Sequence, residues 1–186
     1  MWNKGIEIYV QEVLKFRRAL NLTSIDNKDV FFARFIEPSL AMAKRMPEKG
    51  RLLDVGSGMG IPGVPLLIVR PYLVGVLVER RKKRAEFLRH LVRILKLDAE
   101  VYDADINHLP RLHVDICVAR AVTNEGRLLE MCGPHANQGA VAVLPVPYAS
   151  ECAHVAGWSM TGEYSVPVGS SPGDSKGQII RCYHYD

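Results

Sequence analysis

The feature that most constrains this chain of 186 residues is the stretch Arg51–Gly63, which reads RLLDVGSGMGIPG. Its apolar start, residues 52–55 interrupted only by Asp54, predicts a buried strand. Glycines follow at positions 56, 58, 60 and 63. Glycine adopts positive φ and carries no Cβ, so a ligand can approach the main chain closely at such a turn. A helix predicted over about 64–70 follows, and its free N–H groups favour a polar or anionic ligand on the turn.

Two nucleotide-binding interpretations fit this turn. Residues 58–63 satisfy the dinucleotide pattern G-x-G-x-x-G, with Pro62 near the start of the following helix. Residues 54–60, DVGSGMG, instead resemble the first motif of the S-adenosylmethionine-dependent methyltransferases. That resemblance implies that Asp54 binds the methionine amino group through a water or a backbone group. A turn that only connects strand to helix is disfavoured, since so many glycines cost chain entropy. We favour the methyltransferase interpretation and keep a nicotinamide oxidoreductase as the alternative.

Composition limits the remaining classes of protein. A length of 186 residues, 48% hydrophobic and 24% charged, predicts one globular domain over 1–186. Within it we expect a helical N-terminal extension over 1–50 and a cofactor-binding core over 51–186. No apolar run reaches the ~20 residues that span a bilayer, and no secretory signal opens the chain, so we expect a cytoplasmic protein without a membrane partner. The four cysteines and six histidines lack ligand-like spacing, which predicts no metal site and no disulfide.

The order of predicted elements indicates an α/β fold. Three helices are expected early: over 6–15, through about residue 35 after a cap at Asp26 or Asn27, and from Pro38 to about Met46. Strands are expected at 73–78, 100–102, 114–118, 140–144, 163–168 and 179–183, with helices over about 80–96 and 125–132. This alternation predicts a doubly wound, mostly parallel sheet that ends in an antiparallel C-terminal hairpin around the loop 169–177.

Several polar residues follow the predicted strands, at the sheet edge where ligands bind in such folds. Glu79 ends the second strand, 21 residues beyond Gly58, where a carboxylate can accept both ribose hydroxyls of an adenosine ligand under either interpretation. After the third strand, Asp105 or Asn107 could hold the adenine amine, with Ile106 against the ring, although Asx residues in loops are commonly turn formers. Arg120 is the strong cation after the fourth strand.

A basic run follows Glu79. Such a run is usually a solvated helix face, but its density at the mouth of a nucleotide site also suggests a nucleic-acid role. The net charge of +4 is compatible with a polyanionic partner without being diagnostic of one. The cations concerned are Arg80, Arg81, Lys82, Lys83 and Arg84, with Arg89 further along the same helix.

Taken together, these residues resemble one family, the glucose-inhibited division protein B group of 16S ribosomal RNA guanine-N-7 methyltransferases. The similarity lies in the segments 21–23, 52–66, 68–71, 83–84, 87–89 and 120–121, and the Gly-x-Pro-Gly-x-Pro continuation of the glycine loop is its most specific part. The resemblance implies S-adenosylmethionine as cofactor and 16S ribosomal RNA or the small ribosomal subunit as partner, for a protein expected to be monomeric.

The resemblance also assigns roles to residues. It implies that the methionine end of the cofactor lies on Asp54, Gly56, Ser57, Gly58 and Gly60. Glu79 would take the ribose, Ile106 and Asn107 would lie near the adenine, and Arg120 would face both cofactor and target base as the catalytic residue. Lys83, Arg84 and Arg89 would contact RNA.

The chain departs from the family pattern at a few positions. Phe35 stands where the family usually has histidine, Pro145 and Val146 stand where a Lys-Gly pair follows the fifth strand, and no arginine is evident near Gly177. Guanine N7 has a lone pair and no proton, so methyl transfer needs placement and no general base. The alternatives are a methyltransferase of the same fold acting on another RNA or a small molecule, and a non-catalytic cofactor-binding protein that docks on ribosomal RNA.

Overall fold

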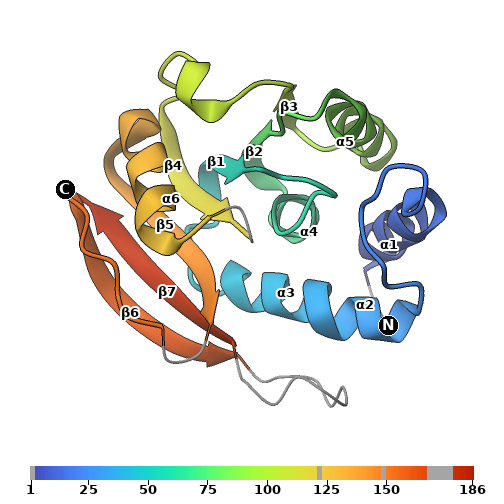
Figure 1. Cartoon of the computed structure of the whole chain (residues 1–186), viewed down its shortest axis with the longest axis horizontal. Helices are drawn as coiled ribbons and strands as arrows, with labels where there is room; N and C mark the ends of the chain where they lie inside the picture. Colours follow the sequence, from blue (N-terminus) through green and yellow to red (C-terminus); the bar gives the residue numbers. More distant parts are fainter. Residues whose placement is uncertain (1–2, 121–122, 148–149, 167–177) are drawn as a thin grey trace.

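A seven-stranded sheet organises the chain, with strand order β3-β2-β1-β4-β5-β7-β6 (Figure 1). The computed structural model describes residues 3–120, 123–147, 150–166 and 178–186. The strands are β1 Lys49–Val55, β2 Tyr72–Val78, β3 Ala99–Tyr102, β4 Val114–Ala119, β5 Ala136–Pro147, β6 Trp158–Val166 and β7 Gln178–Tyr185. The helices are α1 Lys4–Phe16, α2 Lys28–Phe31, α3 Glu37–Ala43, α4 Gly63–Val69, α5 Lys82–Leu95 and α6 Glu125–Cys132.

Strand direction confirms the predicted mixed sheet. β1 pairs in parallel with β2 and β4, as do β2 with β3 and β4 with β5. β7 runs antiparallel between β5 and β6, and its register joins Val166 to Gln178 across the hairpin. The predicted hairpin is therefore present, with its second strand inserted inside the sheet. The loop expected over 169–177 lies outside the described residues.

Alternation along β1 divides the buried side chains between the two faces of the sheet. Leu52 belongs to the core cluster that includes Tyr9, Val64 and Leu88, from α1, α4 and α5. Leu53 belongs to the second cluster, which contains residues of α6. Because successive side chains of a strand point to opposite faces, the short apolar run 52–55 serves both cores.

The predicted second and third helices form one helical segment. α2 passes through a π-helical turn, Phe32–Ile36, directly into α3. Pro38, at the start of α3, has no N–H to give to the carbonyl four residues earlier and its ring crowds that carbonyl, which accounts for the wider turn. The Asn27 side chain caps α2 by accepting a hydrogen bond from Val30 N at 3.0 Å, as predicted for one of two candidates.

Several bounds differ from the sequence prediction: β5 begins at Ala136 where 140 was predicted, β6 begins at Trp158 where 163 was predicted, and three further differences have local causes or consequences. α3 ends at Ala43, short of Met46. β1 begins at Lys49, three residues before the predicted strand over 52–55, and the Asp115 carboxylate accepts a hydrogen bond from Arg51 N at 2.9 Å, which anchors the start of the strand. β5 extends to Pro147. Pro145 and Val146, which stand where the family usually has Lys-Gly after the fifth strand, therefore lie within the strand. Pairing with β7 produces this length, and no local signal encodes it.

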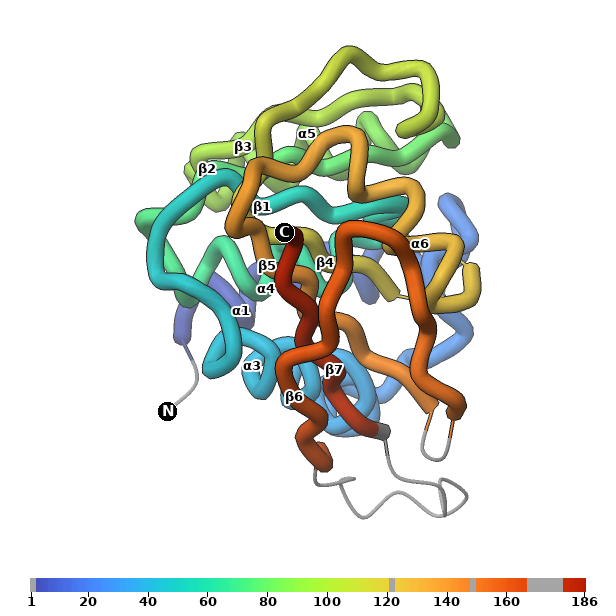
Figure 2. Tube along the Cα trace, turned by 90° about the vertical axis from the view of Figure 1, so that its left-hand side faces the viewer, coloured from blue at the N-terminus to red at the C-terminus, as the bar shows by residue number. Residues whose placement is uncertain are grey.

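The N-terminal helices pack on the sheet beside the C-terminal hairpin. Figure 2 shows α3 next to β6 and β7, and the guanidinium carbon of Arg45 lies 3.7 Å from the Tyr164 ring centroid. On the other side, His90 Nε2 of α5 lies 2.6 Å from the Glu12 carboxylate of α1. Helices α1, α2 and α3 thus contribute to the same core cluster as α4 and α5, on one face of the sheet.

Candidate functional site

A cavity of about 660 Å³ lies at the carboxyl ends of the parallel strands, on the turn between β1 and α4. This is the edge where ligands bind in open α/β sheets. Eleven predicted site residues line it: Gly56, Ser57, Gly58, Glu79, Arg80, Arg81, Arg84, Asp105, Ile106, Asn107 and Arg120. Five others are not in its lining: Asp54, Gly60, Lys82, Lys83 and Arg89.

Backbone contacts shape the glycine turn. Gly56, Gly58 and Gly60 have φ values of +67°, +57° and +97°, in the left-handed region that favours glycine. Ser57 N donates to Val78 O at 3.0 Å and Ser57 Oγ donates to Asp54 O at 2.9 Å, which ties the turn to the end of β2. A Cβ at Gly60 would come within 2.7 Å of Val64 Cγ2, so this glycine serves the close approach of α4.

Glu79 lies at the end of β2 with its carboxylate at the cavity. Its Oε2 accepts from Gly58 N at 3.0 Å and its Oε1 from Arg81 N at 2.8 Å, and the residue is only 6% exposed. Each carboxylate oxygen has about two lone-pair sites, so each can accept one more hydrogen bond. The residue is thus held in place by two backbone groups while keeping acceptor capacity for a pair of ribose hydroxyls.

If the cavity binds the adenosine ligand expected from the sequence, Glu79→Ala should weaken the binding of S-adenosylhomocysteine by about 1–3 kcal/mol, because the two ribose hydroxyls would lose their acceptor. Isothermal titration of the purified protein measures this directly. Glu86→Ala, which removes an exposed carboxylate of α5 outside the cavity, is the matched control and should leave the affinity unchanged. Equal affinity of the Glu79 variant and the wild type would remove Glu79 from the ribose site.

Asp54 lies beneath the turn and not on the cavity wall. The residue is fully buried, its Oδ2 accepts from Gly63 N at 3.1 Å, and its Oδ1 has no hydrogen-bond partner among the described residues. Burial raises the pKa of Asp54 to about 7, and the hydrogen bond from Gly63 N opposes this rise. The carboxyl group braces the start of α4 and is not part of the cavity lining, and the predicted contact with the methionine amino group, through a water or a backbone group, stays a prediction.

This pKa predicts a pH dependence of stability. The pKa of Asp54 in the folded state lies above its ordinary value near 4, so the folded state binds the proton more tightly than the unfolded state. The resulting contribution to the free energy of unfolding is complete below about pH 4 and is lost as the pH rises to about 7. The loss amounts to a few kcal/mol, at most about 4. Asp54→Asn keeps an acceptor for Gly63 N without the charge. The free energy of unfolding, measured in urea on the ligand-free protein, should rise in the variant relative to the wild type between pH 4.5 and 7. If the difference between the two proteins does not change with pH, Asp54 does not have the raised pKa.

The loop after β3 forms the far side of the cavity. Asp105 Oδ1 accepts from Asn107 N at 3.0 Å and Asn107 Nδ2 at 2.7 Å, and these contacts lower the pKa of the Asp105 carboxyl. Ile106 between them is 2% exposed. Behind the loop, His135 is buried, and its Nδ1 has no hydrogen-bond partner among the described residues. Burial lowers the pKa of His135, and the backbone of Ile106 and Pro110 opposes this lowering. His135 was not anticipated, because nothing local links it to a loop some thirty residues earlier.

Arg120 joins the end of β4 to the N-terminal helices at the cavity. Its Nη1 donates to Arg34 O at 2.9 Å, and its Cζ lies 4.7 Å from the Phe35 ring centroid. Arg34 is four residues before Pro38, which cannot supply the usual helical hydrogen bond to that carbonyl. Phe35, Thr123 and Arg127 also line this end of the cavity and were not predicted as site residues. The sequence did contain an indication for Phe35, because Pro38, three residues further on, disturbs the helix at this point.

The basic run divides into two groups. Arg80 and Arg81 are exposed and line the cavity, and Lys82 and Lys83 are exposed at the start of α5. Arg84 donates to the carbonyls of Leu20 and Asn21, which holds the loop after α1. Arg89 pairs with Glu86 at 2.7 Å and with Asp103 at 2.8 Å. The guanidinium groups of Arg84 and Arg89 thus have partners within the protein, and the first four cations are the group that faces outward.

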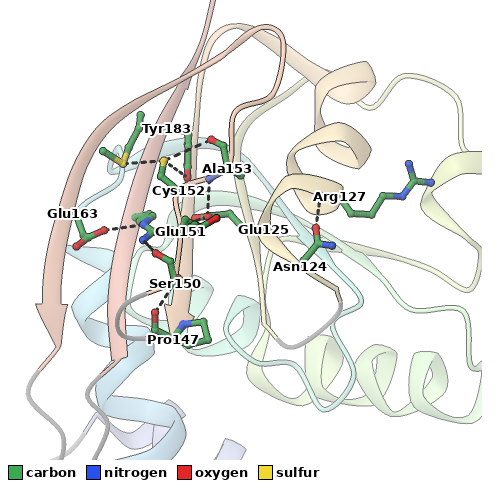
Figure 3. A network of polar contacts seen from close by, with 12 residues as sticks. Asn124, Glu125, Arg127, Pro147, Ser150, Glu151, Cys152, Ala153, Glu163 and Tyr183 are labelled. Atoms are coloured by element: carbon green, nitrogen blue, oxygen red, sulfur yellow. Dashed lines mark hydrogen bonds and ion pairs between the residues drawn. The ribbon is translucent and has the colours of Figure 1, made fainter.

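A buried ion-pair network surrounds Arg181 of β7, and Figure 3 shows its partners Glu125, Glu163, Ser150 and Glu151. The Arg181 side chain is 4% exposed and reaches Glu125 Oε2 and Glu163 Oε2, each at 2.8 Å. It also donates to the carbonyls of Glu151, at 2.9 Å, and Ser150. Figure 3 shows these acceptors coming from α6, β6 and the segment after β5. Arg181 is outside the cavity lining, and sequence reasoning missed it because its partners lie 18 to 56 residues away.

Two surveys of the described residues complete the site. No group of three histidine, cysteine, aspartate or glutamate side chains is placed there to hold a metal ion. No helix in that part of the chain is long and apolar enough to cross a membrane. Cys117, which follows Ile116 within β4, is fully buried in the core.

The strand order, the glycine turn after β1 and the acidic residue at the end of β2 define the fold of the S-adenosylmethionine-dependent methyltransferases. An S-adenosylmethionine-dependent methyltransferase from Aquifex aeolicus has a similar structure, with a TM-score of 0.60 at 16% sequence identity over 82% of this chain and 92% of that one. The chain belongs to the GidB family, rRNA small subunit methyltransferase G, whose sequence model matches residues 3–151.

Two relatives illustrate this membership. Ribosomal RNA small subunit methyltransferase G of Syntrophotalea carbinolica is 34% identical over 134 residues, which cover 69% of this chain and 62% of the relative. Ribosomal RNA small subunit methyltransferase G 3 of Bdellovibrio bacteriovorus is 32% identical over 183 residues, covering 89% of this chain and 81% of the relative. The chain thus spans between three-fifths and four-fifths of the length of these two proteins.

Proposed function

We propose that the protein transfers a methyl group from S-adenosylmethionine to N7 of a guanine in 16S ribosomal RNA. The observation that carries the proposal is the placement of Glu79 and Arg120 on either side of the glycine turn, in one cavity. Family membership supports the substrate class, because the matching relatives are named as methyltransferases of the small-subunit ribosomal RNA.

The cavity residues fit the cofactor. Glu79 has acceptor capacity left for ribose hydroxyls, and the turn at Gly56 and Gly58 leaves the main chain open to a ligand. Ile106 supplies an apolar surface for a purine, and Asn107 a polar group at its edge. When bound, S-adenosylmethionine supplies an electrophilic methyl group on a sulfonium.

The chain's own residues then have a modest chemical task. Guanine N7 carries a lone pair and no proton, so accepting the methyl group would require no general base from the chain. What the protein must provide is alignment and exclusion of water. Arg120 can donate to guanine O6 and hold the base while N7 stays free, since arginine is suited to that edge of guanine. Arg80, Arg81, Lys82 and Lys83 would neutralise phosphates nearby.

Oligomeric state, location and substrate complete the proposed function. We infer that the protein acts as a monomeric, single-domain enzyme in the cytoplasm, on ribosomal RNA or the small subunit. Analytical ultracentrifugation checks the first part. A sedimentation coefficient that rises with protein concentration would show that the protein forms an oligomer.

The test of the reaction is transfer of labelled methyl to small subunits from a strain that lacks the modification, with the labelled base mapped by cleavage at N7-methylguanine. Label at one guanine is the expected result. Label elsewhere in RNA, or only on a small molecule, would favour a methyltransferase of the same fold with another substrate. Cofactor binding by titration without any label would favour a protein that docks on ribosomal RNA without catalysis.

A further inference from the structure

We propose that the Phe35 ring is the surface on which the acceptor base stacks, and that Phe35 and Arg120 together form the acceptor side of the cavity. The inference rests on the proposed function and deepens it, because it names a residue that selects a flat aromatic acceptor. Both side chains line the cavity, and the guanidinium carbon lies 4.7 Å from the ring centroid.

The position of Phe35 follows from the π-helical turn that contains it. The turn spans Phe32–Ile36, and the carbonyl of Phe32 accepts a hydrogen bond from Glu37 N, five residues on. Ser39 Oγ donates to Phe35 O at 2.7 Å, and the Phe31 ring packs at 4.9 Å from the Phe35 ring. Turns of this kind occur frequently at functional sites. Here Pro38 accounts for the turn, and the turn presents a half-buried ring to the cavity.

The strand order places this ring at the acceptor end. β1 lies between β2 and β4, so Glu79 and Arg120 flank the glycine turn from opposite sides. A cofactor held by Glu79 and the glycine turn would occupy the side of the cavity toward β2, which leaves the side toward β4 for an acceptor. An acceptor must therefore enter on the side of Arg120, where Phe35, Thr123 and Arg127 complete the lining.

The chemistry of the pair suits a nucleobase. Unstacked bases are recognised by stacking on aromatic rings and on guanidinium planes, with hydrogen bonds at their edges. Arg120 is held by the Arg34 carbonyl at 2.9 Å and by the Phe35 ring, so its orientation is fixed before the base arrives. Phe35 therefore acts in two ways, as a stacking surface and as a group that positions Arg120.

The experiment compares Phe35→Leu with Phe35→Tyr. Leucine retains apolar packing against Phe31 but has no π face, whereas tyrosine keeps the ring. We expect Phe35→Leu to lower kcat/KM for the RNA by about tenfold or more, mostly through KM, and Phe35→Tyr to retain most of the wild-type value. The affinity for S-adenosylhomocysteine, measured by titration, should stay within about twofold of wild type in both variants, which also shows that both are folded.

Three outcomes would overturn the inference, and they are distinguishable. Equal kcat/KM for the two variants would show that the ring is not used for stacking. A loss of cofactor affinity in Phe35→Leu as large as its loss of kcat/KM would reduce Phe35 to a structural residue. A wild-type protein that methylates no RNA would refute the proposed function itself and this inference with it, whereas the first two results leave methyl transfer by the wild type intact.

Discussion

Arg120→Ala is expected to lower kcat for methyl transfer by about 100-fold or more, which corresponds to about 2.7 kcal/mol of transition-state stabilisation. Alanine removes the donor proposed for guanine O6 and also the contacts with Arg34 O and the Phe35 ring, so the base would lose both its hydrogen bond and its fixed surroundings. The measurement is single-turnover transfer of labelled methyl to small subunits at saturating cofactor, which isolates the chemical step from product release.

Arg120→Lys serves as the comparison, since lysine keeps the charge but lacks the planar fork of donors. We expect this variant to fall between alanine and wild type. The unfolding midpoint in urea should change little for either variant, because Arg120 is half-buried and outside the core clusters. Turnover by Arg120→Ala within about threefold of wild type would exclude Arg120 from the active site.

The parts of the site that sequence predicted well are those encoded over short distances. The glycine turn joins β1 to α4 within about ten residues, and its apolar flanks and glycines indicate both elements and the space between them. Glu79 was found for a related reason, since a carboxylate after a second buried strand has a defined place in a doubly wound sheet. Strand bounds inside the sheet were predicted to within one or two residues for β2, β3 and β4.

The parts that sequence missed depend on contacts across long separations. The placement of Asp54 illustrates this, because a motif resemblance specifies which residue is acidic but not whether its carboxylate faces the ligand or the start of α4. Likewise, the sequence alone does not distinguish the members of the basic run. In the structure, Arg84 donates hydrogen bonds to the loop after α1, and Arg89 donates to Asp103. Which cations remain exposed is decided by the packing of α1 and β3 against α5.

In the N-terminal helices, Pro38 indicated more about the site than the sequence prediction took from it. Pro38 was interpreted as the start of a separate helix, which is a common place for proline. In the structure the helical segment continues through it, the turn before it widens, and Phe35 and the Arg34 carbonyl meet Arg120 at the cavity. A proline inside a helix frees a carbonyl, and the position of a partner for that carbonyl is decided by the fold of the remaining chain.

Arg181→Met is expected to destabilise the protein by about 3–5 kcal/mol, the largest effect on stability that we predict. The guanidinium group is 4% exposed, and its removal leaves the Glu125 carboxylate, itself 9% exposed, without its cation. The carbonyls of Ser150 and Glu151 lose a donor at the same time, so the segment after β5 is released from β7. Urea unfolding at pH 7 in the absence of ligand measures the change.

Two further variants decide whether the buried charge is the cause. Arg127→Met removes an arginine whose ion pair with Glu130 is more than half exposed on both sides, so its cost should stay below about 1 kcal/mol. Arg181→Met combined with Glu125→Gln removes both members of the buried pair. If an uncompensated carboxylate is responsible, the double variant should regain 1 kcal/mol or more, by an order-of-magnitude estimate for a buried charge. A double variant no more stable than Arg181→Met would instead attribute the loss to the two carbonyls, and would mean that Arg181 acts mainly as a tether between β7 and the segment after β5.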